Sequence, residues 1–162
     1  MRGKIIGLAG FVLLLAACSS TPTPAPTGPA GPTGPGGAGV GAVVPGSQQD
    51  LAQSAGDRVF FEFDRSDITS EAQQILERQA AWLQRYPNVT VTIEGHCDER
   101  GTREYNLALG ERRASAVKNV LVAAGIPASR IATISYGKER PIVLGSDEQA
   151  WAQNRVAITT VN

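Results

Sequence analysis

The chain has 162 residues, and its 15 Lys and Arg balance its 15 Asp and Glu, so the formal net charge at pH 7 is zero. Residues 1–17 hold two basic and no acidic residues, and without them the charge becomes −2. No basic excess remains that could follow a phosphate backbone, which argues against nucleic acid as a partner. The single histidine excludes every metal or catalytic site that needs two imidazoles.

Residues 1–17 are typical of a targeting segment. Arg2 and Lys4 supply positive charge before an apolar run, residues 5–17. A run of about thirteen residues is too short to span a bilayer and has the length of a signal peptide. It ends in Leu-Ala-Ala-Cys at 15–18, which resembles the bacterial lipobox.

The lipobox predicts that Cys18 becomes the acylated first residue of the mature chain. Several acyl chains together anchor firmly, because each buried methylene contributes about 0.8 kcal/mol. Ser19 stands where an Asp would favour retention in the inner membrane of many Gram-negative bacteria, so we expect lipid anchoring at the periplasmic face of the outer membrane. An ordinary signal peptide with an incidental cysteine is the alternative. Cys97 has no intramolecular partner for a disulfide, and we expect it to be packed rather than reactive.

Residues 18–56 are predicted to form a tether. From Ser19 to about Gly46 the chain has neither charged nor aromatic residues and is dominated by Pro, Gly, Ala and Thr. Such a segment buries too little apolar area to offset the entropy of ordering, so we expect it to be disordered. As a spacer it would let a folded head work at a distance from the membrane.

Residues 57–162 are long enough for one domain with a single core. Hydrophobic periodicity, capping residues and turn residues predict its elements. In chain order they are a strand over 59–63, a helix from Thr69 to Tyr86, a strand over 89–94, a helix over 104–124, a strand over 130–136, a short helix over 147–153 and a strand over 155–161. Strands alternating with helices of this length predict an α/β sandwich in which both long helices cover a sheet face.

The stretch Gly-His-Cys-Asp-Glu-Arg-Gly-Thr at 95–102 lies between the second predicted strand and the second long helix. In open α/β sheets, ligands gather at such carboxyl ends of strands. Asp98 in this loop and Arg113 on the helix could together hold a zwitterion, with the carboxylate taking an ammonium and the guanidinium fork taking a carboxylate. On spacing alone, a structural salt bridge between Asp98 and Arg113 is equally compatible. The other nearby charges are interpreted as solvated surface residues: Glu99, Arg100, Arg103 and Glu111.

Four motifs resemble the OmpA-like peptidoglycan-binding domain. They are Phe-Glu-Phe-Asp at 61–64, Glu-Gly-His-Cys-Asp-Glu-Arg-Gly-Thr at 94–102, Tyr-Asn-Leu-Ala-Leu-Gly-Glu-Arg-Arg-Ala at 105–114 and Ser-Tyr-Gly-Lys-Glu at 135–139. The resemblance covers essentially all of residues 58–162. It implies an OmpA-like βαβαβ fold, with two long helices packed on a mixed four-stranded sheet and a short helix before the last strand.

In that family the ligand is the meso-diaminopimelate of the cell-wall peptide stem, which carries a free ammonium and a free carboxylate on its distal centre. The resemblance assigns charge recognition to Asp98 and Arg113. It also assigns supporting roles in ligand binding to five further residues. It assigns the backbone donors and the walls of the binding site to Phe63, Asp64 and Leu109. It assigns the support of the site to Thr102 and Asn106. No cofactor, metal or catalytic residue is implied.

With the lipobox and the tether, the resemblance implies membership of the Tol–Pal envelope system, with the periplasmic protein TolB and other components as partners. The implied roles are envelope integrity and constriction of the outer membrane during cell division. The chain departs from the family pattern in two places. Cys97 replaces a small residue such as Ala or Thr, and Asn154-Arg155-Val156 lacks the second Arg that many relatives carry at its third position.

A cell-wall-acting hydrolase or a metal-dependent enzyme at the loop from His96 to Glu99 is the main alternative. Consecutive residues at a strand end point to opposite faces and converge poorly on one ion or atom. The sequence shows neither a phosphate-cradling glycine loop nor a nucleophile elbow. A purely mechanical OmpA-like module would need a transmembrane or oligomerising segment, which we do not recognise. We therefore expect a binding protein and not an enzyme.

Overall fold

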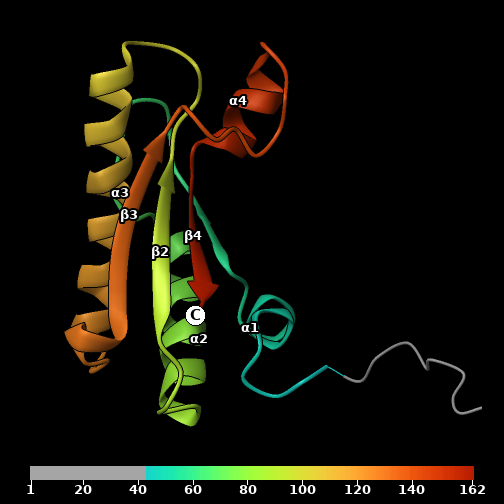
Figure 1. Cartoon of the computed structure of the whole chain (residues 1–162), viewed down its shortest axis with the longest axis vertical. Coiled ribbons are helices and arrows are strands. Elements are labelled where there is room, and N and C mark those ends of the chain that lie inside the picture. Colours follow the sequence, from blue (N-terminus) through green and yellow to red (C-terminus); the bar gives the residue numbers. More distant parts are fainter. Residues whose placement is uncertain (1–42) are drawn as a thin grey trace, which may run out of the picture. The chain divides into compact units, whose positions relative to one another are not determined.

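The computed structural model describes residues 43–162 of the chain (Figure 1). The predicted signal peptide, the lipidation site Cys18 and most of the predicted tether lie outside the described residues. Within residues 43–162, no helix combines the length and the apolar composition needed to cross a membrane.

A four-stranded sheet in the order β1-β4-β2-β3 forms the centre of the fold. The strands β1 (Arg58–Phe60) and β2 (Val91–His96) each pair antiparallel with β4 (Val156–Val161). Strand β2 pairs in parallel with β3 (Ile131–Gly137). The sheet is therefore mixed, and the predicted fold class is confirmed.

Two long helices, α2 (Ser70–Arg85) and α3 (Arg103–Ala123), pack on each other and on the sheet (Figure 1). Each begins after a threonine whose hydroxyl accepts a hydrogen bond from an amide of the first turn: Thr69 from Ala72 and Thr102 from Tyr105. Such caps satisfy amides that have no partner within the helix. The core between helices and sheet includes Leu76, Leu83, Val91, Ile93, Val117 and Leu121.

Two short helical elements complete the domain. The 3-10 turn η1 (Ala128–Arg130) leads into β3, and α4 (Glu148–Asn154) precedes β4 as predicted. The side chain of Asn154 ties α4 to the loop before it, because its carbonyl oxygen accepts hydrogen bonds from the amides of Ile142 and Val143 at 2.7 and 3.0 Å.

The folded domain begins before residue 57, which corrects the predicted tether over 18–56. Helix α1 (Gln48–Ser54) lies inside that segment, and its Leu51 is fully buried in the core. The Gln48 side chain donates a hydrogen bond to the Thr159 carbonyl at 3.1 Å and accepts one from the Val161 amide at 2.8 Å, so it links α1 to β4. The helix is too short for its periodicity to stand out from the Gly- and Pro-rich sequence before it.

Candidate functional site: a charged cavity at the strand ends

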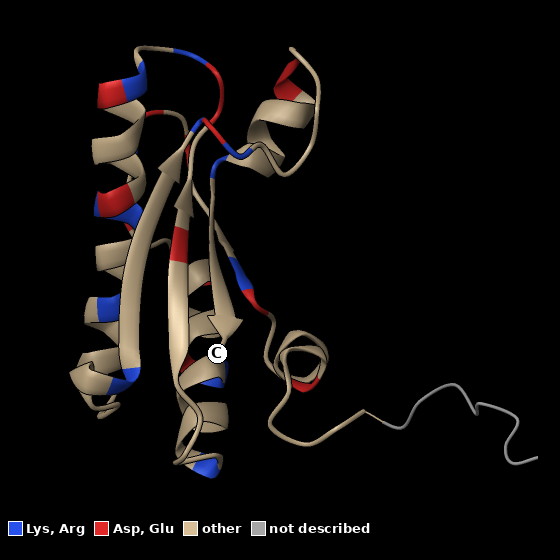
Figure 2. Ribbon diagram, in the orientation of Figure 1, with Lys and Arg blue, Asp and Glu red and all other residues tan. Residues whose placement is uncertain are grey.

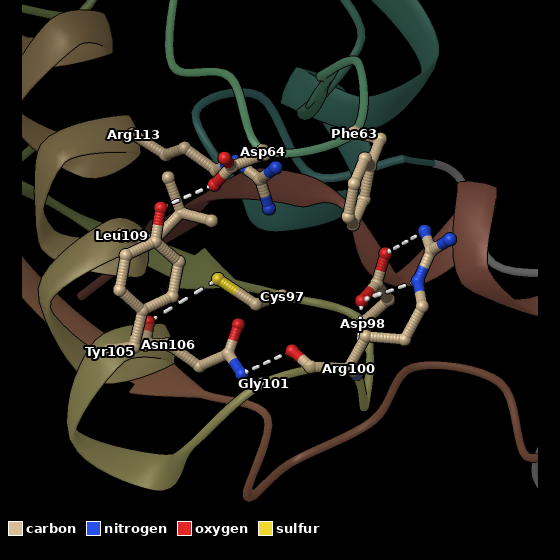
Figure 3. A pocket seen from close by; sticks show the side chains of 10 residues that line it. All are labelled: Phe63, Asp64, Cys97, Asp98, Arg100, Gly101, Tyr105, Asn106, Leu109 and Arg113. Atoms are coloured by element: carbon tan, nitrogen blue, oxygen red, sulfur yellow. Dashed lines mark hydrogen bonds and ion pairs between the residues drawn. The ribbon is translucent and has the colours of Figure 1, made fainter.

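A cavity of about 150 Å³ lies beside the carboxyl end of β2 (Figure 3). Sites that enclose a drug-sized ligand measure roughly 300–1,000 Å³, so this cavity suits a single amino-acid head group. The lining residues come from the loop after β1, the loop after β2 and helix α3. They are Phe63, Asp64, Cys97, Asp98, Arg100, Gly101, Tyr105, Asn106, Leu109 and Arg113. Of the seven predicted ligand-binding residues, only Thr102 does not line it.

Two glycines bring α3 close enough to β2 to form this cavity. A Cβ atom at Gly95 would lie 1.9 Å from the carbonyl oxygen of Gly110, so no larger residue fits there. With the helix held at this distance, Asn106, Leu109 and Arg113 project from one face of α3 toward the strand end, because residues three and four apart share a helix face.

The loop after β1 forms one wall. The strand ends at Phe60, earlier than the predicted end at Phe63. At Asp64 the backbone φ is 58°, a left-handed conformation that is uncommon for a residue other than glycine. This turn leaves Phe63 56% exposed at the mouth of the cavity, while the Asp64 carboxylate accepts a hydrogen bond from the hydroxyl of Tyr105.

Arg113 is fully buried and holds the loop after β1 to the end of β2. Its Nε donates to the Arg65 carbonyl at 2.9 Å, its Nη1 to the His96 carbonyl at 2.8 Å and its Nη2 to the Glu62 carbonyl at 3.2 Å. These bonds use three of the five guanidinium N–H donors, and the other two have no hydrogen-bond acceptor among the described residues. Burial lowers the pKa of Arg113, but arginine has so high a pKa that the group stays charged.

Asp98 lies across the cavity from Arg113 (Figure 3). Its carboxylate pairs with Arg100, whose Nη2 is 2.6 Å away, and with Arg155, whose Nη1 is 3.5 Å away. Burial opposes ionisation, but hydrogen bonds from the side chain and the amide of Arg100 hold the pKa of Asp98 below its ordinary value. The residue is therefore a carboxylate at neutral pH. Its ion pairs are with Arg100 and Arg155, and none joins it to Arg113, so the alternative of a structural salt bridge between Asp98 and Arg113 is wrong.

Arg100 is not the solvated surface residue that the sequence suggested. Its guanidinium lies between two aromatic rings, 4.0 Å from the centre of Phe63 and 4.2 Å from that of Trp151. The loop beneath it is held by Asn106, whose amide donates to the carbonyls of Arg100 and Thr102 at 2.8 and 3.0 Å. Thr102 thus supports the loop and caps α3.

The geometry gives little support to catalysis at the loop from His96 to Glu99. Cys97 is buried, and burial raises the pKa of its thiol to about 11, so the nucleophilic thiolate is scarce at neutral pH. His96 is also buried, with Nδ1 3.0 Å from the Arg140 carbonyl and Nε2 without a hydrogen-bond partner. Across residues 43–162, no three His, Cys, Asp or Glu side chains come together as a metal site would need.

Comparison with known proteins identifies the family. The sequence model of the OmpA family matches residues 60–155, which is more than half of the chain. The chain belongs to the OmpA family. The family resemblance recognised in the sequence is thereby confirmed.

Named relatives extend this similarity. The peptidoglycan-associated lipoprotein of Agrobacterium fabrum is 57% identical over 123 residues, which cover 76% of this chain and 70% of the relative. The peptidoglycan-associated lipoprotein of Pasteurella multocida is 44% identical over 155 residues, covering 96% of this chain and 95% of the relative.

Solved structures show the same fold. The peptidoglycan-associated lipoprotein from Burkholderia pseudomallei is 42% identical and superposes with a TM-score of 0.64, covering 65% of this chain and 90% of that one. The C-terminal domain of Helicobacter pylori MotB reaches a TM-score of 0.62 at 23% identity, covering 65% and 84%, so it shares the fold alone.

Proposed function

We propose that this protein is an outer-membrane-anchored lipoprotein that binds peptidoglycan noncovalently and carries out no catalysis. The observation that carries the proposal is the placement of Asp98 and Arg113 on two sides of one small cavity. A carboxylate and a guanidinium that line one cavity match the two opposite charges of an amino-acid head group. The names of its relatives, which associate those proteins with peptidoglycan, support the same choice of ligand.

The moiety recognised is the distal end of meso-diaminopimelate in the stem peptide. Its ammonium goes to Asp98, and its carboxylate goes to the two remaining N–H groups of Arg113. Phe63 and Leu109 contact the methylene chain, and the main chain at Asp64 supplies a further polar contact. Asn106 and Thr102 keep the loop in place.

The wall-binding domain works from a membrane anchor. Acylation of Cys18 fixes one end of the chain in the outer membrane, and the domain reaches the cell wall through the segment between them. In this way the protein links the outer membrane to the wall as a component of the Tol–Pal system, with TolB and other Tol–Pal proteins as partners. The result is envelope integrity and constriction of the outer membrane during division.

Co-sedimentation with purified sacculi tests the binding site. Phe63→Ala removes an exposed wall of the cavity, and Asp98→Asn removes the charge that takes the ammonium while keeping a similar shape. Both changes should reduce the pelleted fraction strongly. Phe60→Ala is the matched control, because Phe60 is similarly exposed, at 42%, but does not line the cavity.

The same incubation separates a binder from a hydrolase. We expect the supernatant to contain no soluble muropeptides after incubation with the wild-type protein. Equal pelleting of the wild type and both cavity variants would reject the assigned site, and release of fragments would reject the noncatalytic role.

A further inference from the structure

We propose that Arg100 is an internal occupant of the ammonium site, which a bound ligand must displace. In the structure its guanidinium pairs with Asp98, and ligand binding exchanges it for the ligand's ammonium. This inference rests on the proposed function of the cavity and assigns the role of setting ligand specificity to Arg100.

The hydrogen bonds of Asp98 leave no place for an ammonium. Oδ1 accepts from the amide and from Nε of Arg100 at 3.1 and 3.3 Å. Oδ2 accepts from Nη2 of Arg100 at 2.6 Å and from Nη1 of Arg155 at 3.5 Å. A carboxylate offers about four lone-pair sites, and these four donors occupy them. A new donor therefore requires that one of the present donors leaves.

The charges around Asp98 lead to the same requirement. Asp98 and Glu148 are joined to Arg100 and Arg155 by ion pairs of 2.6, 2.7, 3.5 and 3.9 Å, so two negative charges meet two positive ones. Figure 2 shows both signs of charge along the loop after β2, acidic residues at the start of α4 and basic colour where α4 leads into β4. An incoming ammonium would meet a carboxylate that is already compensated. It gains a full ion pair only if one guanidinium withdraws.

Arg100 is the donor that can withdraw. Its side chain is 32% exposed, whereas that of Arg155 is 7% exposed. Arg155 is also bound to the Phe61 carbonyl at 3.1 Å and to Glu148 at 2.7 Å. Besides Asp98, the Arg100 guanidinium contacts Glu148, whose 65% exposed carboxylate is 3.9 Å away, and the rings of Phe63 and Trp151. An exposed ion pair and a cation–π contact at an exposed site each contribute only about 1 kcal/mol or less.

The exchange makes the site selective for a ligand with both charges. A simple amine must displace Arg100 and gives the freed guanidinium nothing in return. An amino-acid head group brings a carboxylate, which the freed Arg100 and the buried Arg113 can both attract. Specificity then comes from a competing interaction within the protein as well as from contacts to the ligand.

Calorimetric titration of the full-length chain in detergent tests this exchange. The ligands are meso-diaminopimelate and cadaverine, which has the same carbon spacing between its amines but no carboxylate. Arg100→Ala should bind cadaverine roughly tenfold more tightly than the wild type, and its preference for diaminopimelate should fall by at least that factor. Arg103→Ala is the matched control, because it removes the same charge from a side chain that is 68% exposed and pairs with Glu139 instead.

Tryptophan fluorescence gives a second readout. Withdrawal of Arg100 from the ring of Trp151 should change the emission when diaminopimelate binds, and the change should be absent in Arg100→Ala and in Trp151→Phe. Cadaverine binding no more tightly to Arg100→Ala than to Arg103→Ala would overturn the exchange, as would unchanged emission of the wild type at saturation. If either of these results appears while diaminopimelate still binds the wild type, the exchange is wrong but the proposed function stands. If diaminopimelate does not bind the wild type, both the exchange and the proposed function are wrong.

Discussion

Gly110 of α3 lies against the main chain of Gly95 in β2, so helix and strand touch through their backbones. A side chain at either position would push the helix outward. Arg113 follows Gly110 by three residues and reaches the His96 carbonyl, one residue beyond Gly95, at 2.8 Å. Packing of the helix and construction of the cavity therefore depend on the same contact.

Gly110→Ala should destabilise the domain by about 1–3 kcal/mol, the usual cost of forcing extra atoms into a packed interior. The added Cβ would lie 2.3 Å from Oγ of Ser135 and 2.9 Å from the carbonyl oxygen of Gly95. Removing the first obstacle with Ser135→Ala should recover part of the lost stability in a double-mutant cycle. Urea unfolding measures both effects, and an unchanged midpoint in Gly110→Ala would show that the contact is not restrictive.

The role of α1 in the domain has its own test. Leu51→Ala removes a fully buried side chain and should lower the free energy of unfolding by about 2–5 kcal/mol. Gln53→Ala, at an exposed position of the same helix, should change it little. Equal stability of the two variants would indicate that α1 does not pack on the core in solution.

The positions of the regular elements could be predicted because each depends on local signals. Helix α2 begins after Thr69 and ends before Tyr86, and the four predicted strands all occur. Strand β1 is the exception in length. Its last predicted residues, 61–63, leave the regular strand, and Phe63 reaches the wall of the cavity. Their path is set by the hydrogen bonds of Phe61 with Arg155 and of Glu62 with Arg113.

The candidate site was predictable only in part, for a physical reason. The motifs placed Asp98 and Arg113 at one strand end, and the structure has both residues lining one cavity. The ion pair of Asp98 with Arg155 and the packing of Trp151 on Arg100 were missed because both depend on tertiary contacts. Arg155 follows α4, and Trp151, which packs on Arg100, lies on that helix. Neither can be located beside Asp98 from sequence spacing.

Acidification should weaken the domain through His96. Burial lowers the pKa of His96 below its ordinary value of 6.5. The unfolded chain therefore takes up a proton at a higher pH than the folded one. The free energy of unfolding falls as the pH drops below 6.5, and the fall ends once the folded state is also protonated.

This contribution is at most about 1.4 kcal/mol per pH unit. Urea unfolding between about pH 7 and pH 5 measures it, and His96→Gln should flatten the dependence, because His96 is the only histidine of the chain. The same slope in wild type and variant would assign the effect to other groups.

Membrane attachment should depend on Cys18. Removing the acylated thiol with Cys18→Ala should move the protein from the outer-membrane fraction to the soluble periplasmic fraction, since no other lipid anchor is proposed. Cys97→Ala serves as the control, and it should leave the distribution unchanged because that thiol is buried in the domain. Continued membrane fractionation of Cys18→Ala would contradict lipidation at this residue.

Competition on purified sacculi tests the central claim most directly. Free meso-diaminopimelate carries both charges that the cavity is proposed to recognise, while cadaverine lacks the carboxylates and pimelate lacks the ammonium groups. We predict that diaminopimelate releases the wild-type protein from sacculi in a concentration-dependent way and that the other two, at the same concentrations, do not. Retention of the protein on sacculi at saturating diaminopimelate, or equal release by all three compounds, would contradict recognition of the paired charges.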